Sequence, residues 1–130
     1  MRNDLEEKLC KAYPKLYVDF GKRESAMFYG ISCGDGWYDI INELSNVIEQ
    51  ENNNGKSIKA AQVKQKFGGL RFYVDFDSRD GLDQIYDAIN KAEKKSMITC
   101  ERCGKLGIWR NNGGWITVTC DEHFKAKIAE

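Results

Sequence analysis

The chain has 130 residues, with 20 basic and 20 acidic side chains, so its formal net charge at pH 7 is zero. This balance argues against a globally basic nucleic-acid-binding protein or an acidic tail, so electrostatic recognition must be local. A chain of this length accommodates one domain, or one domain with a small attached module. The segment beginning at Met1 lacks the apolar stretch of a signal peptide, and no apolar run approaches the length that crosses a bilayer. We therefore expect a soluble, cytoplasmic protein.

The first part of the chain is expected to hold a short helix, two short strands and one long helix. Asn3 is suited to cap the first helix. Weak alternation of polar and apolar residues predicts strands over residues 16–20 and 27–33. A turn follows at residues 34–36, where Asp35 can cap the next helix, and apolar residues then recur at helical spacing. The stripe consists of Trp37, Ile40, Ile41, Leu44, Val47 and Ile48.

A polar loop over residues 51–55, expected to be mobile, precedes a predicted β-hairpin. Polar and apolar residues alternate over residues 61–67 and again over residues 70–76, as in half-buried strands. Gly68-Gly69 between them is suited to a two-residue turn. One face of this hairpin must pack against the core. It carries Val63, Phe72, Val74 and Phe76.

The opposite face of the predicted hairpin is basic. In the register that the glycine turn imposes, Lys66 faces Arg71 and Lys64 faces Tyr73. Like charges directly opposite each other destabilise a sheet. A bound phosphate would relieve the repulsion, and Tyr73 offers a ring on which a base can stack. The alternative is that acidic residues neutralise the cluster and the face is simply solvated. Lys64, Lys66, Arg71 and Tyr73 are thus candidate ligand-binding residues.

The C-terminal segment holds the most specific motif of the chain. Cys100 and Cys103 form a Cys-x-x-Cys pair, and sixteen residues separate it from the Cys-x-x-His pair of Cys120 and His123. Three thiolates and one imidazole are the donors of a closed tetrahedral zinc site, which is structural because catalytic zinc usually keeps one position for water. The alternatives are ordinary buried cysteines with a surface histidine, or a disulfide, which a reducing compartment disfavours.

The residues around these ligands predict a treble-clef arrangement. Gly104, after the first pair, is suited to the tight turn of a zinc knuckle. Residues 108–119 have the pattern of a β-hairpin whose turn lies at residues 111–114. The two acids that follow Cys120 suit the N-terminus of a helix, which residues 124–129 can continue.

Other candidate sites are less well supported. The glycine-rich turn at residues 33–37 could offer backbone N–H groups to an anion, but the carboxylate of Asp35 competes for those donors. Catalysis is weakly indicated, because the sole histidine is a predicted metal ligand and Cys33 has no neighbouring base. Asp75 and Asp77 could bind a divalent metal, although residues at the end of a strand are usually just solvated.

Four segments of the chain carry a resemblance to a known family. They are KLCKAYPKLY, GISCGDGWYDIINEL, AAQVKQKFGGLRFYV and CERCG…GGWITVTCDEH. Together they resemble small bacteriophage and prophage proteins with a C-terminal Cys3His zinc module, a family for which no activity is established. The resemblance spans nearly the whole chain and implies a phage or mobile-element origin, but it carries over no catalytic residues.

We therefore expect an α+β fold. Residues 1–97 should form a domain of two amphipathic helices, the second running from after Asp80 to about Ser96, on a small antiparallel sheet. Residues 98–130 should form the treble-clef zinc module. The expected function is phage-type binding without turnover that acts on host defence or regulation, with a nucleotide signal or nucleic acid as ligand. The alternative is a protein–protein inhibitor or adaptor that contacts a host protein through Trp109, Trp115 and the zinc module. A metal-dependent enzyme is third.

Overall fold

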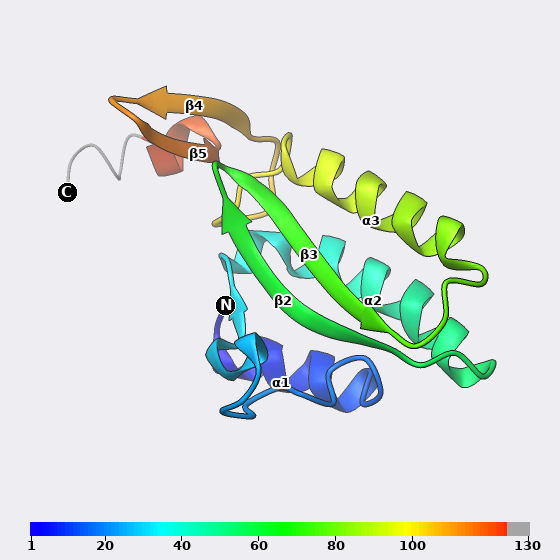
Figure 1. The fold of residues 1–130 in the computed structure, drawn as a ribbon. Helices are drawn as coiled ribbons and strands as arrows, with labels where there is room; N and C mark the ends of the chain where they lie inside the picture. Colours follow the sequence, from blue (N-terminus) through cyan, green and yellow to red (C-terminus); the bar gives the residue numbers. More distant parts are fainter. Residues whose placement is uncertain (125–130) are drawn as a thin grey trace.

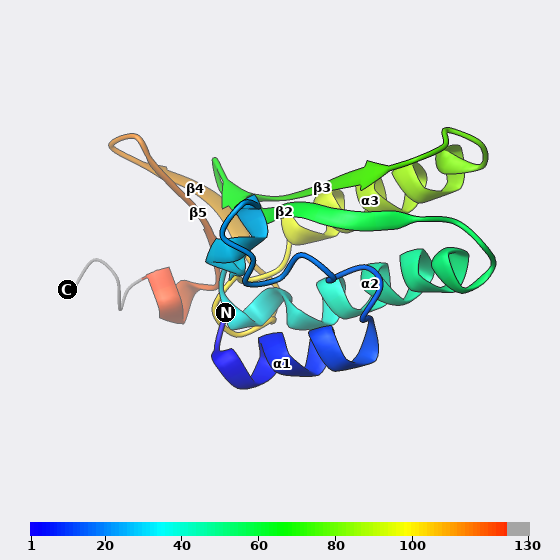
Figure 2. The ribbon, with the colours of Figure 1, turned by 60° about the horizontal axis from the view of Figure 1, so that its bottom comes forward.

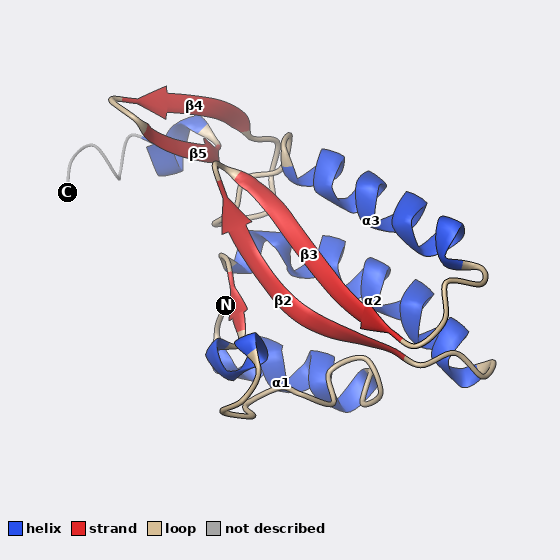
Figure 3. Cartoon of the chain, viewed as in Figure 1, coloured by secondary structure: helices blue, strands red, loops and turns tan. Residues whose placement is uncertain are grey.

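A computed structural model describes residues 1–124, so most of the helix expected over residues 124–129 lies outside the described residues. The fold is α+β: helices cover one face of a small sheet, and a separate two-stranded hairpin follows near the C-terminal end (Figures 1 and 3). No helix among residues 1–124 is long and apolar enough to cross a membrane. The elements are α1 (Asn3–Ala12), η1 (Ala26–Tyr29), β1 (Ile31–Ser32), η2 (Asp35–Trp37), α2 (Tyr38–Asn53), β2 (Ile58–Lys66), β3 (Gly69–Phe76), α3 (Leu82–Ser96), β4 (Ile108–Asn112) and β5 (Trp115–Thr119).

The main sheet is mixed rather than purely antiparallel as predicted. Its strand order is β1-β2-β3, with β2 and β3 antiparallel and β1 parallel to β2. A parallel pair needs a crossover connection, and α2 supplies it between β1 and β2. The strand expected over residues 27–33 shortens to β1, because Ser25 accepts a hydrogen bond from the Met27 N–H and starts η1 instead. Residues 16–20, also expected as a strand, form turns.

The hairpin turn between β2 and β3 lies one residue earlier than predicted. Lys66 pairs with Gly69, so the turn residues are Phe67 and Gly68, with φ angles of 52° and 88°. Two consecutive residues with positive φ define the turn type whose twist matches that of the flanking strands. The predicted pairing of Lys66 with Arg71 is therefore wrong, and Lys64 stands opposite Arg71. The residues of each face keep their side, because the pairing shifts by an even number of residues.

A β-bulge keeps the inner face of β2 apolar along its whole length. The pairing skips Ala61, so that Ala60 pairs with Val74 while Gln62 pairs with Tyr73. An extra residue in one strand reverses the alternation of faces. Ala60 and Val63 consequently both point inward, and each is fully buried.

The core lies between the sheet and the helices α2 and α3, which pack against its inner face (Figure 2). The predicted inward stripe of α2 is confirmed for Trp37, Ile41, Leu44 and Ile48, all of which are buried. They belong to one cluster with Val63 and Phe72, against which Val74 and Phe76 pack with partial burial. Val47, at the edge of the stripe, remains 42% exposed.

The end of α2 is ordered by polar contacts that the sequence did not suggest. Residues 51–53 continue the helix instead of forming a mobile loop, and Asn52 is buried. Its side chain accepts from the Ile58 N–H and donates to the Ile58 carbonyl, both at 2.8 Å. The carboxylate of Glu49, also buried, accepts hydrogen bonds from the N–H groups of Lys15 and Leu16. These two side chains fix the start of β2 and the chain that follows α1.

Candidate metal centre and basic surface

The four predicted metal ligands converge on one point. The ligand atoms of Cys100, Cys103, Cys120 and His123 all lie within 4.8 Å of one another. The Nδ1 atom of His123 lies 3.2 Å from the Cys120 sulfur and 3.6 Å from the Cys100 sulfur. The sulfur atoms of Cys103 and Cys120 are 3.8 Å apart. Residues distant in sequence thus form a compact donor set.

The separations of 3.6 Å between His123 and Cys100 and of 3.8 Å between Cys103 and Cys120 are close to those around a tetrahedral metal ion. Metal–sulfur bonds of about 2.3 Å and metal–nitrogen bonds of about 2.0 Å place two sulfurs ~3.8 Å apart and a sulfur and a nitrogen ~3.5 Å apart. Burial acts to raise the pKa of the Cys100 thiol, but the backbone N–H groups of Cys120, Cys103 and Arg102 outweigh it and lower that pKa to about 6. Cys100 therefore favours the thiolate, the form of cysteine that binds metals. At Cys103, a nearby backbone N–H lowers the thiol pKa, but burial and the neighbouring Cys100 and Cys120 sulfurs outweigh it and raise that pKa.

The backbone around the ligands forms the predicted knuckle, hairpin and helical turn. Gly104 has a φ of 83°, and its N–H donates to the Cys100 carbonyl. In the following hairpin Asn112 pairs with Trp115, which leaves Gly113 and Gly114 as the turn residues. Residues 121–124 then form a helical turn that carries the last ligand.

The knuckle docks on the glycine turn that precedes α2. The Gly36 N–H donates to the Glu101 carbonyl at 2.7 Å, and the Gly34 N–H donates to the Glu101 carboxylate at 2.9 Å. A Cβ atom on Gly36 would lie only 2.1 Å from the Cys100 carbonyl oxygen. The indole N–H of Trp37 donates to the Thr99 carbonyl. The N–H groups of Gly34 and Gly36 thus bind the knuckle, which leaves them unavailable to an anionic ligand.

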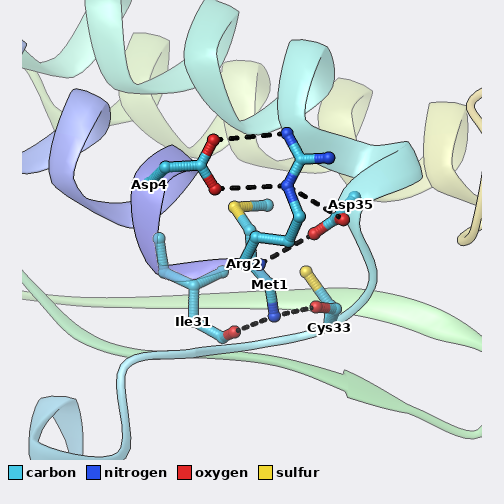
Figure 4. A network of polar contacts seen from close by, with 6 residues as sticks. All are labelled: Met1, Arg2, Asp4, Ile31, Cys33 and Asp35. Carbon is cyan, nitrogen blue, oxygen red and sulfur yellow. Dashed lines mark hydrogen bonds and ion pairs between the residues drawn. The ribbon is translucent and has the colours of Figure 1, made fainter.

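Asp35 in the same turn binds the N-terminal segment, so the prediction that it caps the following helix is wrong (Figure 4). Its carboxylate accepts a hydrogen bond from the Arg2 N–H at 2.8 Å. The ammonium group of Met1 donates to the carbonyls of Ile31 and Cys33 beside it. Arg2 is also the N-terminal cap of α1, which places Asn3 inside the helix rather than at the predicted cap.

The two remaining cysteines are poorly suited to nucleophilic chemistry. Burial is the main cause that raises the pKa of Cys33 to about 12 and that of Cys10 to about 11. A thiol reacts as its thiolate, so both groups are protonated at neutral pH.

The predicted ligand-binding residues share the outer face of β2 and β3. Lys64 stands opposite Arg71 and next to Ser32 of β1, and Tyr73 stands opposite Gln62. Since Lys66 pairs with Gly69, it lies diagonal to Arg71, within reach of long side chains. Tyr73 is 44% exposed. Three cations and one aromatic ring therefore form a continuous surface, which we call the basic face (Lys64, Lys66, Arg71 and Tyr73).

Charge is unevenly distributed along the hairpin. Lys59 stands opposite Asp75, and its ammonium group lies 2.8 Å from the Asp19 carboxylate, which Lys22 also contacts. Nearer the turn, no ion pair within residues 1–124 involves any cation of the basic face. The end of the hairpin distant from the turn is neutralised, whereas the end nearest the turn is not.

Phe67 at the turn is a feature that sequence analysis missed, because the predicted turn placed it inside β2. It is the one non-glycine residue with positive φ within the described chain, and its side chain is 66% exposed. The ammonium group of Lys66 lies 5.7 Å from the centre of its ring. Left-handed backbone costs an L-residue roughly 1–2 kcal/mol. The alternation of polar and apolar residues over 61–67 gave no indication of a turn at Phe67, because the same pattern fits a strand that includes this residue.

The β4–β5 hairpin packs against this turn. A Cβ atom on Gly68 would lie 2.8 Å from the Ile116 side chain and 3.4 Å from the Trp109 ring. In β4–β5, Trp109 pairs with Val118, whereas Trp115 pairs with Asn112. This register places Trp109 and Trp115 on opposite faces of the hairpin. The two tryptophans of the expected protein-binding surface are therefore not brought together on one face.

Comparison of the chain with protein-family models, with curated proteins and with solved structures finds no match. Its function must therefore be inferred from its own side chains.

Proposed function

We propose that Cys100, Cys103, Cys120 and His123 hold one structural zinc ion. The support is a set of three sulfurs and one nitrogen whose ligand atoms all lie within 4.8 Å of one another, which is a common zinc donor set. Zinc would contribute the folding free energy of a module whose own apolar core is small. It would also hold β4–β5 against the turn that joins β2 and β3.

We further propose that the protein binds a phosphate-bearing ligand on the basic face, without turnover. The observation that carries this proposal is the direct opposition of Lys64 and Arg71, with Lys66 diagonal to the latter and no ion-pair partner for them among residues 1–124. Cations clustered in this way repel one another. An anion bound between them would convert that repulsion into charge-assisted hydrogen bonds.

The setting we propose is the cytoplasm of a bacterial host, where the protein would act on host defence or regulation. The support is the resemblance of four sequence segments to bacteriophage and prophage proteins. A nucleotide signal and a nucleic acid both carry the phosphate groups that the basic face would bind.

A second candidate is a protein adaptor or inhibitor. It is favoured by exposed apolar side chains near the metal site, where Leu106 is 77%, Ile98 57% and Ile108 56% exposed. Apolar contacts depend weakly on salt, whereas phosphate binding weakens steeply as salt rises.

The test of the phosphate proposal is a double variant with a charge-matched control. Lys64→Ala/Arg71→Ala removes two cations of the basic face, and Lys22→Ala/Lys59→Ala removes the two that contact Asp19. Binding is measured by fluorescence anisotropy with a labelled oligothymidine strand and, separately, with labelled ATP. We expect the first variant to bind much more weakly and the second to bind like the unmodified protein. Equal binding by both variants, or no binding of either probe by the unmodified protein, would contradict the proposal.

A further inference from the structure

We propose that the ligand of the basic face is single-stranded nucleic acid, whose unpaired bases stack on Phe67 and Tyr73 while its phosphates contact the cations between them. This inference rests on the function proposed above and specifies the class of ligand. Two features of the hairpin carry it: the exposed ring at the turn, and the cluster of cations between that turn and Tyr73.

The first feature is the conformation of Phe67. Both residues of this turn have positive φ, a position that asparagine or glycine adopts most readily. Phenylalanine there is strained, and its ring is mostly exposed instead of buried. Phenylalanine at position 67 therefore has neither the relaxed backbone that asparagine would have there nor the stabilisation that a buried aromatic ring would give. Strain of this kind marks functional positions, and a ring that a ligand covers would recover the lost burial.

The second feature is the arrangement of groups between the turn and Tyr73. Tyr73 lies four residues beyond Gly69 on β3, which is about 14 Å at ~3.4 Å per residue. In the strand pairing, the positions of Lys64, Lys66 and Arg71 fall between Tyr73 and the turn that holds Phe67. A nucleic-acid strand presents bases and phosphates in alternation, and stacking on aromatic side chains combined with cationic contacts is how such strands are bound.

This arrangement also selects against two related ligands. A mononucleotide has one base and cannot cover both rings. In a duplex the faces of the bases are hidden in the stack, so that neither ring could be covered. An unpaired strand of several nucleotides can stack bases on both rings and place phosphates against the cations at the same time.

The zinc module gives the turn a fixed position. Trp109 and Ile116 contact the region around Gly68, and the Gln65 side-chain amide lies 3.5 Å from the Ile116 carbonyl. Side chains held by neighbouring structure lose less freedom when a ligand binds. The same contacts place the Trp109 ring, which is 45% exposed, beside the turn.

The experiment compares aromatic variants of the full-length protein for binding to labelled oligothymidine. Phe67→Asn removes the ring but suits positive φ. Tyr73→Leu removes the second ring, and Tyr73→Phe is its control because it keeps the ring. Circular dichroism verifies that each variant is folded. Competition with thymidine monophosphate and with a duplex of the same sequence measures selectivity for the single strand.

We expect the single strand to bind more tightly than either competitor. Phe67→Asn and Tyr73→Leu should each weaken binding about fivefold or more, and Tyr73→Phe should bind like the unmodified protein. Unchanged affinity in the folded ring-deletion variants, or equal affinity for duplex and single strand, would overturn the inference. If Lys64→Ala/Arg71→Ala still weakens binding strongly in that case, the phosphate proposal stands. Failure of the unmodified protein to bind any of these probes would overturn both.

Discussion

At the scale of single residues, Phe67 is poorly suited to its place in the fold but well suited to the proposed ligand binding. Its φ of 52° suits asparagine or glycine, and its ring gains little from burial at 66% exposure. A residue that is unfavourable for the fold and displayed to solvent is expected where function requires it.

Replacing Phe67 by asparagine should therefore stabilise the fold. Asparagine visits the left-handed region more readily, so Phe67→Asn should raise the free energy of unfolding by about 1 kcal/mol in urea denaturation. Phe67→Leu keeps the unfavourable backbone and should bring no such gain. A loss of stability in Phe67→Asn would show that the ring contributes to the fold.

Cys103 is the metal ligand best suited to a test by substitution, because it is exposed and its replacement removes little packing. Cys103→Ser should lose its metal, since the closed site then lacks one thiolate. Elemental analysis of the purified protein measures the zinc content directly. Cys10→Ser, a change outside the site, should retain it. Full zinc retention in Cys103→Ser would refute the assignment.

At the scale of elements, the buried carboxylate of Glu49 joins α2 to the segment after α1. It accepts hydrogen bonds from the Lys15 and Leu16 N–H groups and from the Asn52 amide. Glu49 lies outside the apolar stripe that the helical period predicts, and nothing local in the sequence distinguishes it from exposed polar neighbours such as Gln50. Its role depends on the Lys15 and Leu16 N–H groups, which are distant from it in sequence.

Glu49→Gln should destabilise the protein by about 1–3 kcal/mol, because an amide group then faces a buried N–H donor. The change is measured by urea denaturation against Gln50→Ala, an exposed position on the same helix. Equal stabilities of the two variants would show that these hydrogen bonds contribute nothing.

The sequence was most informative where the determinants are local. The metal ligands follow from their spacing, and the inner face of α2 follows from its helical period. The register of β2 and β3 did not follow, because by sequence Gly68-Gly69 makes a more favourable turn than the strained Phe67-Gly68 turn that forms, and both registers keep the same faces. The pairing of β1 was also missed, since it depends on a crossover through α2 rather than on the two residues of the strand.

At the scale of the whole molecule, the main core and the metal centre are distinct. The principal cluster of buried residues extends no further along the chain than Ala92. Cys100 and Val118 are buried outside it. We therefore expect the module to depend on metal binding and the core of α2, α3 and the sheet to be independent of it.

Removal of the metal should consequently loosen one part of the molecule. After chelation, hydrogen exchange should accelerate at backbone amides over residues 100–120, while α2 and β3 remain protected. The reason is that metal binding supplies the folding free energy of such modules, roughly 10–16 kcal/mol in zinc-finger peptides. Zinc added back should restore protection. Equal loss of protection in α2 would show that the core also depends on the metal.

The most direct test of the central claim is the salt dependence of oligothymidine binding. Each phosphate contact to a single strand contributes about −0.7 to the slope of log K against log salt, so the three cations of the basic face predict a slope of about −2. Lys64→Ala/Arg71→Ala should bind more weakly with a slope of about −0.7, and Lys22→Ala/Lys59→Ala should match the unmodified protein. The same slope and affinity in all three proteins would contradict phosphate binding at the basic face.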